Sequence, residues 1–378
     1  MRRSVERVFA DSRDSDLADS LRANVSRFAA YKADYVKTTI ENILNDASIP
    51  AKDKQAYIDA NMNAFSQYQA TEETTTTSRS RTAKQWKEFN DPQRLRLFPN
   101  LRWLPSRSIE KRQSHIQFYD HVWSKGDDFW NHNTPGTEWN CKCDVEETDD
   151  PVTNNGNMDP VQVPAGLEGN PAITREIFTD GASYIKKGNK QRVEKFWKPI
   201  EEGFETYRQY RDGSDYEDVM MSWDNGGMKA THINHKTHPN DNKKYFNDTL
   251  TGDDLEKEFM QVAFEKGHHI IFRKEDVNLT DLDMFLDGIK MDLKSVTENS
   301  VNLRNQLKSK NNQLINYNDL RSENNDAVCL YFHDASYFSY DKLAQGMQKL
   351  KDVTPKVLIK RVFVLKNDGS DVELYEFP

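Results

Sequence analysis

One short stretch in the C-terminal half, residues 281–295, constrains the fold more than any other part of the chain. Its sequence is Asp281-Leu-Asp-Met-Phe-Leu-Asp-Gly-Ile-Lys-Met-Asp-Leu-Lys-Ser295. The Asp-Gly pair at 287–288 is typical of a two-residue hairpin turn, because both central positions of such a turn need positive φ angles. The strands would then pair Leu286 with Ile289, Phe285 with Lys290, Met284 with Met291, and Asp283 with Asp292.

This predicted hairpin has one apolar and one charged face, because side chains alternate along a strand. The apolar face comprises Leu282, Met284, Leu286, Ile289, Met291 and Leu293. On the charged face, Asp283 and Asp292 stand directly opposite each other and would weaken the hairpin by repulsion. A divalent cation between the two carboxylates would remove that repulsion, so the hairpin predicts a metal site.

Composition and charge exclude several classes of protein. The 378 residues suffice for two or three domains, and 52 basic against 61 acidic residues give a net charge of −9, which excludes a uniformly basic nucleic-acid coat. We find neither a signal-peptide core nor a run near the roughly 18 apolar residues that span a bilayer. Three cysteines make no disulfide framework. We therefore expect a soluble protein of a reducing cytoplasm, without a membrane partner.

The N-terminal half reads as mostly helical. Apolar residues recur at helical spacing over residues 17–46, and further helices are expected at 51–69 and 81–89. The Thr-rich segment 71–81 is predicted to be a mobile loop or the start of a helix. Four tryptophans crowd into residues 98–145, which predicts a small mixed unit, and the turn-rich segment 149–160 is a linker candidate.

The C-terminal half alternates helical and extended patterns. From a helix that ends at Gly267, the expected order is helix, three strands, helix, strand, helix, strand, strand. This order predicts an α/β domain around a mixed sheet. The chain is thus multidomain: residues 1–165 form an N-terminal domain, 166–215 bridging helices, and 216–378 the α/β domain.

A Cys-x-Cys motif follows the tryptophan-rich segment. Cys141 and Cys143 are preceded within 30 residues by His115, His121 and His132. Two thiolates with one or two of these imidazoles, His115 among them, would hold a structural Zn²⁺. Alternatively, the two thiols are buried beside a packed tryptophan cluster and bind nothing.

Six ordered elements in this half resemble the phage Mu F-like head morphogenesis domain. They are Ala83-Lys-Gln-Trp86, Leu101-Arg-Trp103, Ser106-Arg-Ser108, Arg112-Gln-Ser-His115, Asp127-Asp-Phe-Trp130, and Pro135-Gly-Thr-Glu-Trp-Asn-Cys-Lys-Cys143. The resemblance covers roughly residues 20–165. It implies a minor head protein that works with portal and procapsid proteins in the bacterial cytoplasm and then resides in the phage head or virion.

The hairpin also carries the residue types of a nuclease site. Asp292 and Lys294 lie two apart on one strand and therefore project from one face, and Asp283 joins them across the hairpin. Phosphodiester hydrolysis uses a hard cation held by oxygen ligands and a lysine that neutralises developing charge. The preceding helix offers Glu256 and Glu258 as a third carboxylate. Alternatively, these charges form a solvated strand face.

This order resembles the PD-(D/E)xK nuclease superfamily, with Leu282 where a proline is common and Asp292 where glutamate is commoner. More narrowly, residues 225–235, the helix that ends at Gly267, and residues 286–295 look like the tRNA nuclease domain of CdiA-type contact-dependent inhibition toxins. The resemblance covers residues 216–365. It implies cleavage of tRNA with Mg²⁺ or Mn²⁺, and a cognate immunity protein as a partner.

Two further groups are candidates for contact with RNA. His232, His235 and His238 recur at every third residue, and one of them could touch phosphate from a polar loop. Arg304 and Lys308 lie on the polar helix that follows the hairpin and could contact the RNA backbone. Two alternatives stay open: a structural head component with an inactive nuclease-like domain, and a metal-independent RNase of barnase or EndoU type centred on His232 or His235.

Overall fold

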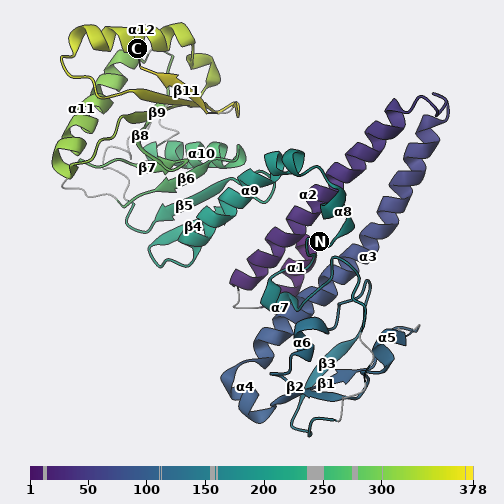
Figure 1. Cartoon of the computed structure of the whole chain (residues 1–378). Coiled ribbons are helices and arrows are strands. Elements are labelled where there is room, and N and C mark those ends of the chain that lie inside the picture. The colour runs from purple at the N-terminus through teal and green to yellow at the C-terminus, as the bar shows by residue number, and fades with distance from the viewer. Residues whose placement is uncertain are drawn as a thin grey trace. The chain divides into compact units, whose positions relative to one another are not determined.

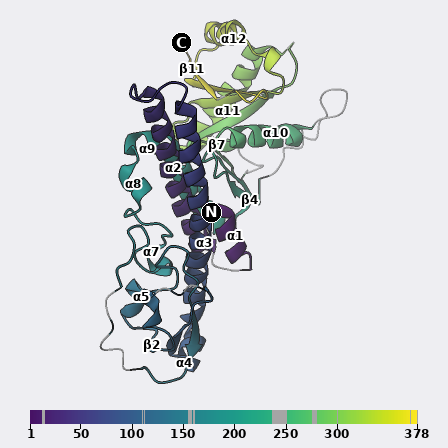
Figure 2. The same cartoon turned by 90° about the vertical axis from the view of Figure 1, so that its right-hand side faces the viewer.

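The computed structural model describes residues 1–11, 15–109, 111, 113–153, 158, 161–235, 251–274, 280–299, 301–370 and 372–377. Arg112, His238 and part of the expected linker at 149–160 lie outside these residues. The chain forms two compact units, Met1–Trp197 (unit 1) and Lys198–Pro378 (unit 2), seen in Figures 1 and 2. No helix formed by the described residues is long and apolar enough to cross a membrane.

Unit 1 is built on a pair of long helices that run side by side in both views (Figures 1 and 2). α2 (Ser15–Asn45) buries Leu17, Leu21, Val25 and Phe28, whose spacing places them on one helical stripe. Against it pack α1 (Arg2–Phe9) and α3 (Lys54–Phe89). The mostly helical N-terminal half expected from the sequence is confirmed.

The Thr-rich segment lies inside α3, so the predicted loop or helix start is wrong, and the helices expected at 51–69 and 81–89 are one helix. The hydroxyls of Thr74, Thr75, Thr76 and Thr77 each donate to the carbonyl four residues earlier, at 2.7–2.9 Å. These bonds satisfy the hydroxyls within the helix. Thr75 and Thr76 are completely buried, so polar residues face the interior here, which a hydrophobic pattern does not predict.

Arg79 of α3 is completely buried. Its guanidinium donates to the carbonyls of Leu167, Glu168, Gly169 and Glu176, at 2.8–3.3 Å. The segment that carries these carbonyls packs against the helices through Leu167, Ile177 and Phe178. Residues 166–197 of the expected bridging segment thus belong to unit 1.

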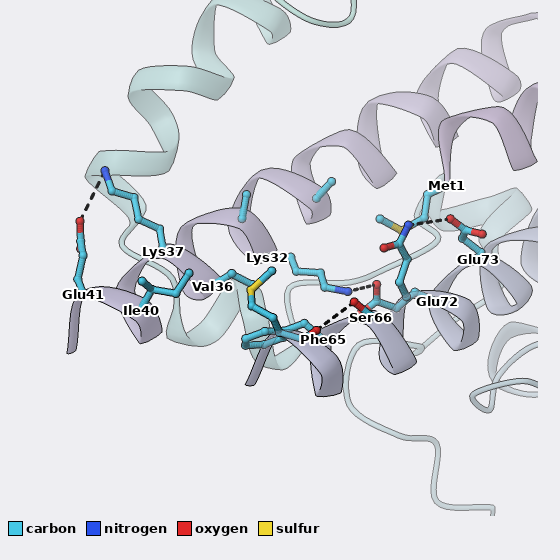
Figure 3. Close-up of a pocket in the computed structure, with 14 residues that line it drawn as sticks. Met1, Lys32, Val36, Lys37, Ile40, Glu41, Phe65, Ser66, Glu72 and Glu73 are labelled. Atoms are coloured by element: carbon cyan, nitrogen blue, oxygen red, sulfur yellow. Dashed lines mark hydrogen bonds and ion pairs between the residues drawn. The ribbon is translucent and has the colours of Figure 1, made fainter. Parts of the chain in front are cut away.

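A groove of about 580 Å³ lies between α2 and α3 (Figure 3). Its walls are apolar where Val36, Ile40 and Phe65 line it, and charged where Lys32 meets Glu72 at 2.6 Å.

The remainder of unit 1 contains a small antiparallel sheet with strand order β2-β1-β3. The strands are β1 (Asn100–Leu104), β2 (Val122–Ser124) and β3 (Asp144–Thr148). The other elements of this part of the chain are α4 (Pro92–Leu97), α5 (Gln113–Ile116) and α6 (Phe129–His132), and α7 (Pro171–Thr174) and α8 (Ser183–Lys187) contact the long helices α3 and α2. Trp103, Trp123 and Trp130 form the aromatic core of this sheet together with Cys141 and Cys143. The predicted mixed unit is confirmed, and both thiols lie within it.

Unit 2 is organised around a mixed sheet, in which the described residues form eight strands in the order β11-β10-β9-β8-β7-β6-β5-β4. The strands are β4 (Tyr216–Met221), β5 (Met228–His232), β6 (His269–Phe272), β7 (Met284–Leu286), β8 (Ile289–Val296), β9 (Ala327–Phe332), β10 (Arg361–Lys366) and β11 (Glu373–Glu376). The helical elements are α9 (Lys190–Arg211), which spans the boundary between the units, α10 (Gly252–Glu265), α11 (Leu303–Arg321), α12 (Tyr340–Val353) and a 3₁₀ turn η1 (Ala335–Tyr337).

The helices of unit 2 cover opposite faces of this sheet. On β9, Ala327, Cys329 and Tyr331 pack in one core with α10, whereas Val328, Leu330 and Phe332 pack in another with α11 and α12. All six residues of β9 are buried. The strand reads as a continuous apolar run because both of its faces are covered.

The element order predicted from α10 onward is confirmed, as is a mixed sheet. β4 and β5 were not predicted. For β4 the reason is that Tyr216–Met221 exposes much of its length and has no clear alternation. Leu282 was assigned to the apolar face of the hairpin with Met284, but it packs in the core on the α11 side. The reason is that β7 begins only at Met284, so strict alternation does not extend back to Leu282.

Candidate functional site

The hairpin forms with the predicted register. Met284 pairs with Met291, Phe285 with Lys290, and Leu286 with Ile289. Asp287 and Gly288 have φ angles of 50° and 77°, as a two-residue turn of this kind requires. Asp287 also accepts hydrogen bonds from the ring of His268 (2.8 Å) and the backbone N–H of His269 (2.9 Å), which fixes the turn to β6.

Asp283 and Asp292 lie together on the α11 side of the sheet. Asp292 is fully buried, and Asp283, half-buried, accepts a hydrogen bond from the backbone N–H of Leu293 at 2.7 Å. Burial raises the pKa of Asp292 well above its ordinary value, and the adjacent Asp283 raises it further. The two carboxylates therefore form a coupled acidic pair inside the protein.

Two residues of α11 complete the surroundings of this pair. Lys310 forms an ion pair with Asp292 Oδ2, and Gln313 Nε2 donates to Asp292 Oδ1 at 3.1 Å. The same Gln313 amide also donates to the carbonyl of Asp281 at 3.1 Å. We refer to Asp283, Asp292, Lys310 and Gln313 as the carboxylate cluster. It combines an acidic pair, one ammonium group and a positioning amide.

Sequence reasoning missed Lys310 and Gln313, because they are 18 and 21 residues from Asp292. A helical signal existed: Lys310 and Gln313 are three residues apart, next to the buried stripe of Leu303, Leu307 and Leu314. That spacing places the two polar residues on one side of the helix. It does not reveal which strand they meet.

Lys294, the lysine predicted for catalysis, lies two residues beyond Asp292 on β8 and is half-buried. Its strand partner is Leu330, whose side chain belongs to the core on the α11 side, as does that of Val328 opposite Asp292. Lys294 and Asp292 therefore share a sheet face, as the Asp-x-Lys spacing predicts.

The structure places the two helix glutamates in other contacts. Glu258 of α10 accepts hydrogen bonds from the buried hydroxyl of Tyr331 at 2.6 Å and interacts with His333 Nδ1 at 2.8 Å. Glu256 lies 3.4 Å from His235 Nε2. Because α10 packs on the sheet face opposite to α11, these glutamates are not brought to the carboxylate cluster.

The candidate RNA-contacting residues occupy different environments. His232 ends β5, accepts a hydrogen bond from the backbone N–H of Asn234 at 3.0 Å and packs edge-on against Tyr216. His235 lies 2.9 Å from the Arg273 carbonyl. On α11, Lys308 is exposed and Arg304 is half-buried. Lys308 is thus the member of this set that is most open to a ligand.

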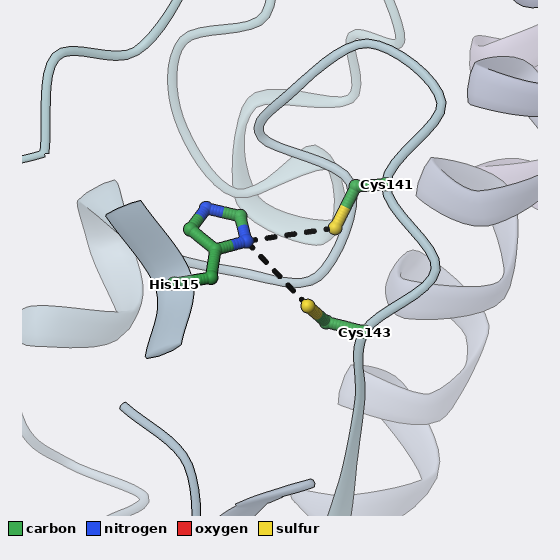
Figure 4. Close-up of side chains that lie close together, drawn as sticks. All are labelled: His115, Cys141 and Cys143. Atoms are coloured by element: carbon green, nitrogen blue, oxygen red, sulfur yellow. Dashed lines mark hydrogen bonds between the residues drawn. The ribbon is translucent and has the colours of Figure 1, made fainter. Parts of the chain in front are cut away.

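A second cluster lies in unit 1, where His115, Cys141 and Cys143 converge (Figure 4). His115 Nδ1 is 3.7 Å from Cys141 Sγ and 3.5 Å from Cys143 Sγ. The potential ligand atoms of these three residues all lie within 4.8 Å of one another. Among the described residues, no other group of three or more His, Cys, Asp or Glu side chains comes together in this way. These residues could hold a metal ion. His121 and His132 make contacts elsewhere, with Thr153 and Asp128.

Comparisons with known proteins add little to this geometry. No protein-family model matches the chain, and no curated protein matches it. Among solved structures, the chain is similar to a CdiA-CT/CdiI toxin and immunity complex from Burkholderia pseudomallei. That match has 16% sequence identity and a TM-score of 0.23, and it covers 32% of this chain and 81% of that chain. A similarity of this size carries no argument about fold or function.

Proposed function

We propose that unit 2 is a metal-dependent endoribonuclease that cleaves tRNA, with Asp283 and Asp292 as ligands of a Mg²⁺ or Mn²⁺ ion. The observation that carries the proposal is the buried acidic pair. Asp292 is fully buried, yet a second carboxyl group, that of Asp283, lies beside its own. Such an arrangement is costly for folding and is typical of functional sites.

The residues present fit a hard divalent cation. Carboxylate oxygens are the ligands that Mg²⁺ and Mn²⁺ prefer, and a bound cation would replace the proton that the raised pKa of Asp292 favours. When bound, such an ion polarises a phosphate and lowers the pKa of water. Gln313 would hold the Asp292 carboxylate in one orientation throughout, because its amide is itself anchored to the Asp281 carbonyl.

Two lysines are available for the phosphate. Lys310 contacts Asp292 directly, and Lys294 lies on the same sheet face. An ammonium group close to the scissile phosphate would stabilise the negative charge that develops during cleavage. Lys308 and Arg304 on α11 would contribute backbone contacts to the RNA.

The choice of tRNA as substrate, and of a cognate immunity protein as partner, rests on the resemblance of residues 225–235 and 286–295 to the CdiA-type tRNA nuclease domain. The charge balance is compatible with a local contact surface for RNA, since an overall charge of −9 excludes only a uniformly basic coat. An immunity protein would protect the producing cell from cleavage of its own tRNA.

For unit 1 we propose the role of a phage minor head protein that assembles with portal and procapsid proteins in the bacterial cytoplasm and enters the virion. Support comes from the six ordered elements between Ala83 and Cys143. Induction of a prophage that encodes the chain, followed by purification of particles, should give virions that contain it. Its absence from purified particles would contradict this role.

The nuclease is tested with the full chain and purified tRNA. We expect cleavage with Mg²⁺ or Mn²⁺, loss of cleavage in EDTA, and recovery when Mg²⁺ alone is added back. Recovery by Mg²⁺ alone matters because EDTA would also strip a soft metal from thiolate ligands, which Mg²⁺ does not replace. Asp292→Asn should be inactive. Asp326→Asn is the matched control, because Asp326 pairs with Arg361 (2.6 Å) and not with another carboxylate.

One specific observation favours a second candidate, a metal-independent RNase. Glu258 and His333 form a carboxylate–imidazole pair at 2.8 Å, a combination that serves in general acid–base catalysis. Both side chains are partly exposed. Cleavage that persists in EDTA and disappears in His333→Gln would support this candidate. Absence of any RNA cleavage would instead support a purely structural unit 2.

A further inference from the structure

The donor set in unit 1 has the composition and spacing of a zinc site. Around a tetrahedral Zn²⁺ with Zn–S near 2.3 Å and Zn–N near 2.1 Å, a sulfur and a nitrogen ligand lie about 3.6 Å apart. The distances from His115 Nδ1 to Cys141 Sγ and Cys143 Sγ are 3.7 and 3.5 Å. The three donor atoms point toward one another, as Figure 4 shows.

The cluster is enclosed by protein. His115 is 1% exposed, and both thiols are buried beside Trp103, which packs edge-on against the His115 ring. Enclosure of this kind suits a structural ion, which needs no access for a substrate. It also separates this group from the oxygen ligands of the carboxylate cluster, which suit harder cations.

The loop that carries the thiols is fixed independently of any metal. Asn140 has a φ angle of 59°, and its backbone N–H donates to Thr75 Oγ1 at 3.0 Å. Cys141 N–H closes a turn onto the Glu138 carbonyl at 3.1 Å, and the Lys142 carbonyl accepts from Arg107 N–H at 3.3 Å. These bonds hold the backbone on both sides of Cys141. The two thiols are therefore held near His115 and do not meet it by chance.

Trp103 presents an unpaired donor beside the thiols. Its buried Nε1–H has no hydrogen-bond partner among the described residues. A thiolate sulfur at Cys143 would give this donor an acceptor.

Glu138 lies on the far side of the His115 ring. Its Oε1 is 3.7 Å from His115 Nε2 and accepts a hydrogen bond from the Ser114 hydroxyl at 2.6 Å. A carboxylate at Nε2 favours the tautomer in which Nε2 carries the proton and Nδ1 presents its lone pair to the sulfurs. Metal-binding histidines commonly have such a carboxylate behind them.

We propose that His115, Cys141 and Cys143 bind one Zn²⁺, or an ion of the same soft class, as a structural centre of unit 1, with Glu138 as the positioning residue for His115. The ion ties α5 to the segment that leads into β3, 26–28 residues later in the chain. This inference does not depend on the nuclease proposed for unit 2, because it involves none of its residues.

The test uses the full chain, purified under reducing conditions from cells supplied with zinc. We expect one zinc per chain by elemental analysis, and a sulfur-to-metal charge-transfer absorption when Co²⁺ replaces it. Cys141→Ser and Cys143→Ser should each lose zinc. Cys329→Ser is the matched control, since Cys329 is the remaining cysteine of the chain, fully buried in unit 2. It should retain one zinc per chain.

The wild-type chain alone can overturn the proposal, so variants that fail to fold do not weaken the test. Folded wild-type protein that contains no zinc, binds no added Zn²⁺ and shows no charge-transfer absorption with Co²⁺ would refute it. With zinc bound, a thiol reagent should react slowly with Cys141 and Cys143, and a chelator should accelerate the reaction. Equal rates with and without the chelator would also count against a bound ion.

Glu138→Gln tests the positioning role separately. The amide still accepts from Ser114 but carries no charge toward His115, so zinc affinity should fall by about ten- to a hundredfold. The Co²⁺ charge-transfer absorption should remain, because both thiolates are unchanged. A merely structural glutamate would leave the affinity for zinc as it is, and that result would remove Glu138 from the proposal while leaving the three ligands.

Discussion

Arg79 in unit 1 and Asp292 in unit 2 are both charged and both completely buried, but their surroundings differ. The Arg79 guanidinium is surrounded by four backbone carbonyls, all of which it satisfies. The Asp292 carboxyl lies against a second carboxyl, that of Asp283, with Lys310 and Gln313 beside it. The neighbours of Arg79 stabilise its charge, whereas Asp283 destabilises a charge on Asp292.

This difference supports a structural role for Arg79 and the functional role that we propose for Asp292. Burial lowers the pKa of Arg79 only to about 10, so the guanidinium stays charged at neutral pH and joins α3 to residues 167–176. For Asp292, burial and a like-charged neighbour act in the same direction on the pKa. The fold gains no stability from this repulsion, which is why we propose the active site there.

The largest effect is expected from Arg79→Met. Removal of the guanidinium leaves the four buried carbonyls without their donor, and should lower the free energy of unfolding of unit 1 by about 3 to 5 kcal/mol. Urea unfolding followed by tryptophan fluorescence measures this, because six of the seven tryptophans lie in unit 1. Arg81→Met, on the same helix but exposed, is the control and should change stability by less than about 0.5 kcal/mol.

Asp292→Asn should reduce tRNA cleavage strongly while changing stability little, the reverse of the large stability loss expected for Arg79→Met. We expect tRNA cleavage to fall about a hundredfold or more, because one of two proposed metal ligands is lost. Stability should change by less than about 1 kcal/mol, since the lost ion pair with Lys310 is offset by relief from Asp283. Hydrogen exchange of the β8 and β9 amides reads out stability in unit 2. Strong destabilisation together with unchanged cleavage would make Asp292 a structural residue like Arg79.

Substitution of Lys310 or Lys294 should reduce the rate of tRNA cleavage by a smaller factor than Asp292→Asn. Lys310→Met removes the ammonium that contacts Asp292 and should reduce cleavage by about tenfold or more. Lys294→Met tests the lysine that the Asp-x-Lys spacing predicts. Comparison of the two rates under saturating Mg²⁺ assigns the phosphate-stabilising role. A larger loss in Lys294→Met would restore the assignment made from the sequence.

The smallest effect concerns pH. The pKa of Asp292 is higher in the folded chain than in the unfolded chain. At pH values between these two pKa values, the folded chain keeps a proton that the unfolded chain releases. The free energy of unfolding should therefore fall as pH rises through this interval, by at most about 1.4 kcal/mol per pH unit. The dependence should be absent in Asp292→Asn and weaker with Mg²⁺ present. Identical pH profiles for wild type and variant would contradict the raised pKa.

Local patterns predicted the parts of the fold that depend on neighbours in the sequence. The hairpin register followed from Asp287-Gly288 and period-two alternation, and the order of elements from α10 onward followed from periodicity. The buried half of α3 could not be predicted in this way. Its interior is polar, and its threonines and Arg79 are satisfied by bonds that only the folded chain reveals.

In the candidate sites, too, contacts between neighbours in the sequence could be predicted and contacts set by tertiary packing could not. Asp283 and Asp292 could be placed together because a tight turn joins them, and His115 was among three histidines offered for the thiols. Lys310 could not be placed, because its meeting with Asp292 depends on how α11 crosses the sheet. The glutamates of α10 were assigned to the hairpin by order alone. Which face a helix covers is set by the tertiary packing of the sheet and not by its position in the chain.

The position of β9 between β8 and β10, parallel to both, has a consequence for synthesis of the chain. During translation, Asp283 and Asp292 emerge before α11, and β9 can pair with β8 only after α11 has been made. Parallel pairing across such a connection is slow compared with a hairpin. We expect the nascent chain to display the two carboxylates before Lys310 and Gln313 reach them. The proposed nuclease would then become active only late in folding, after most of unit 2 has left the ribosome.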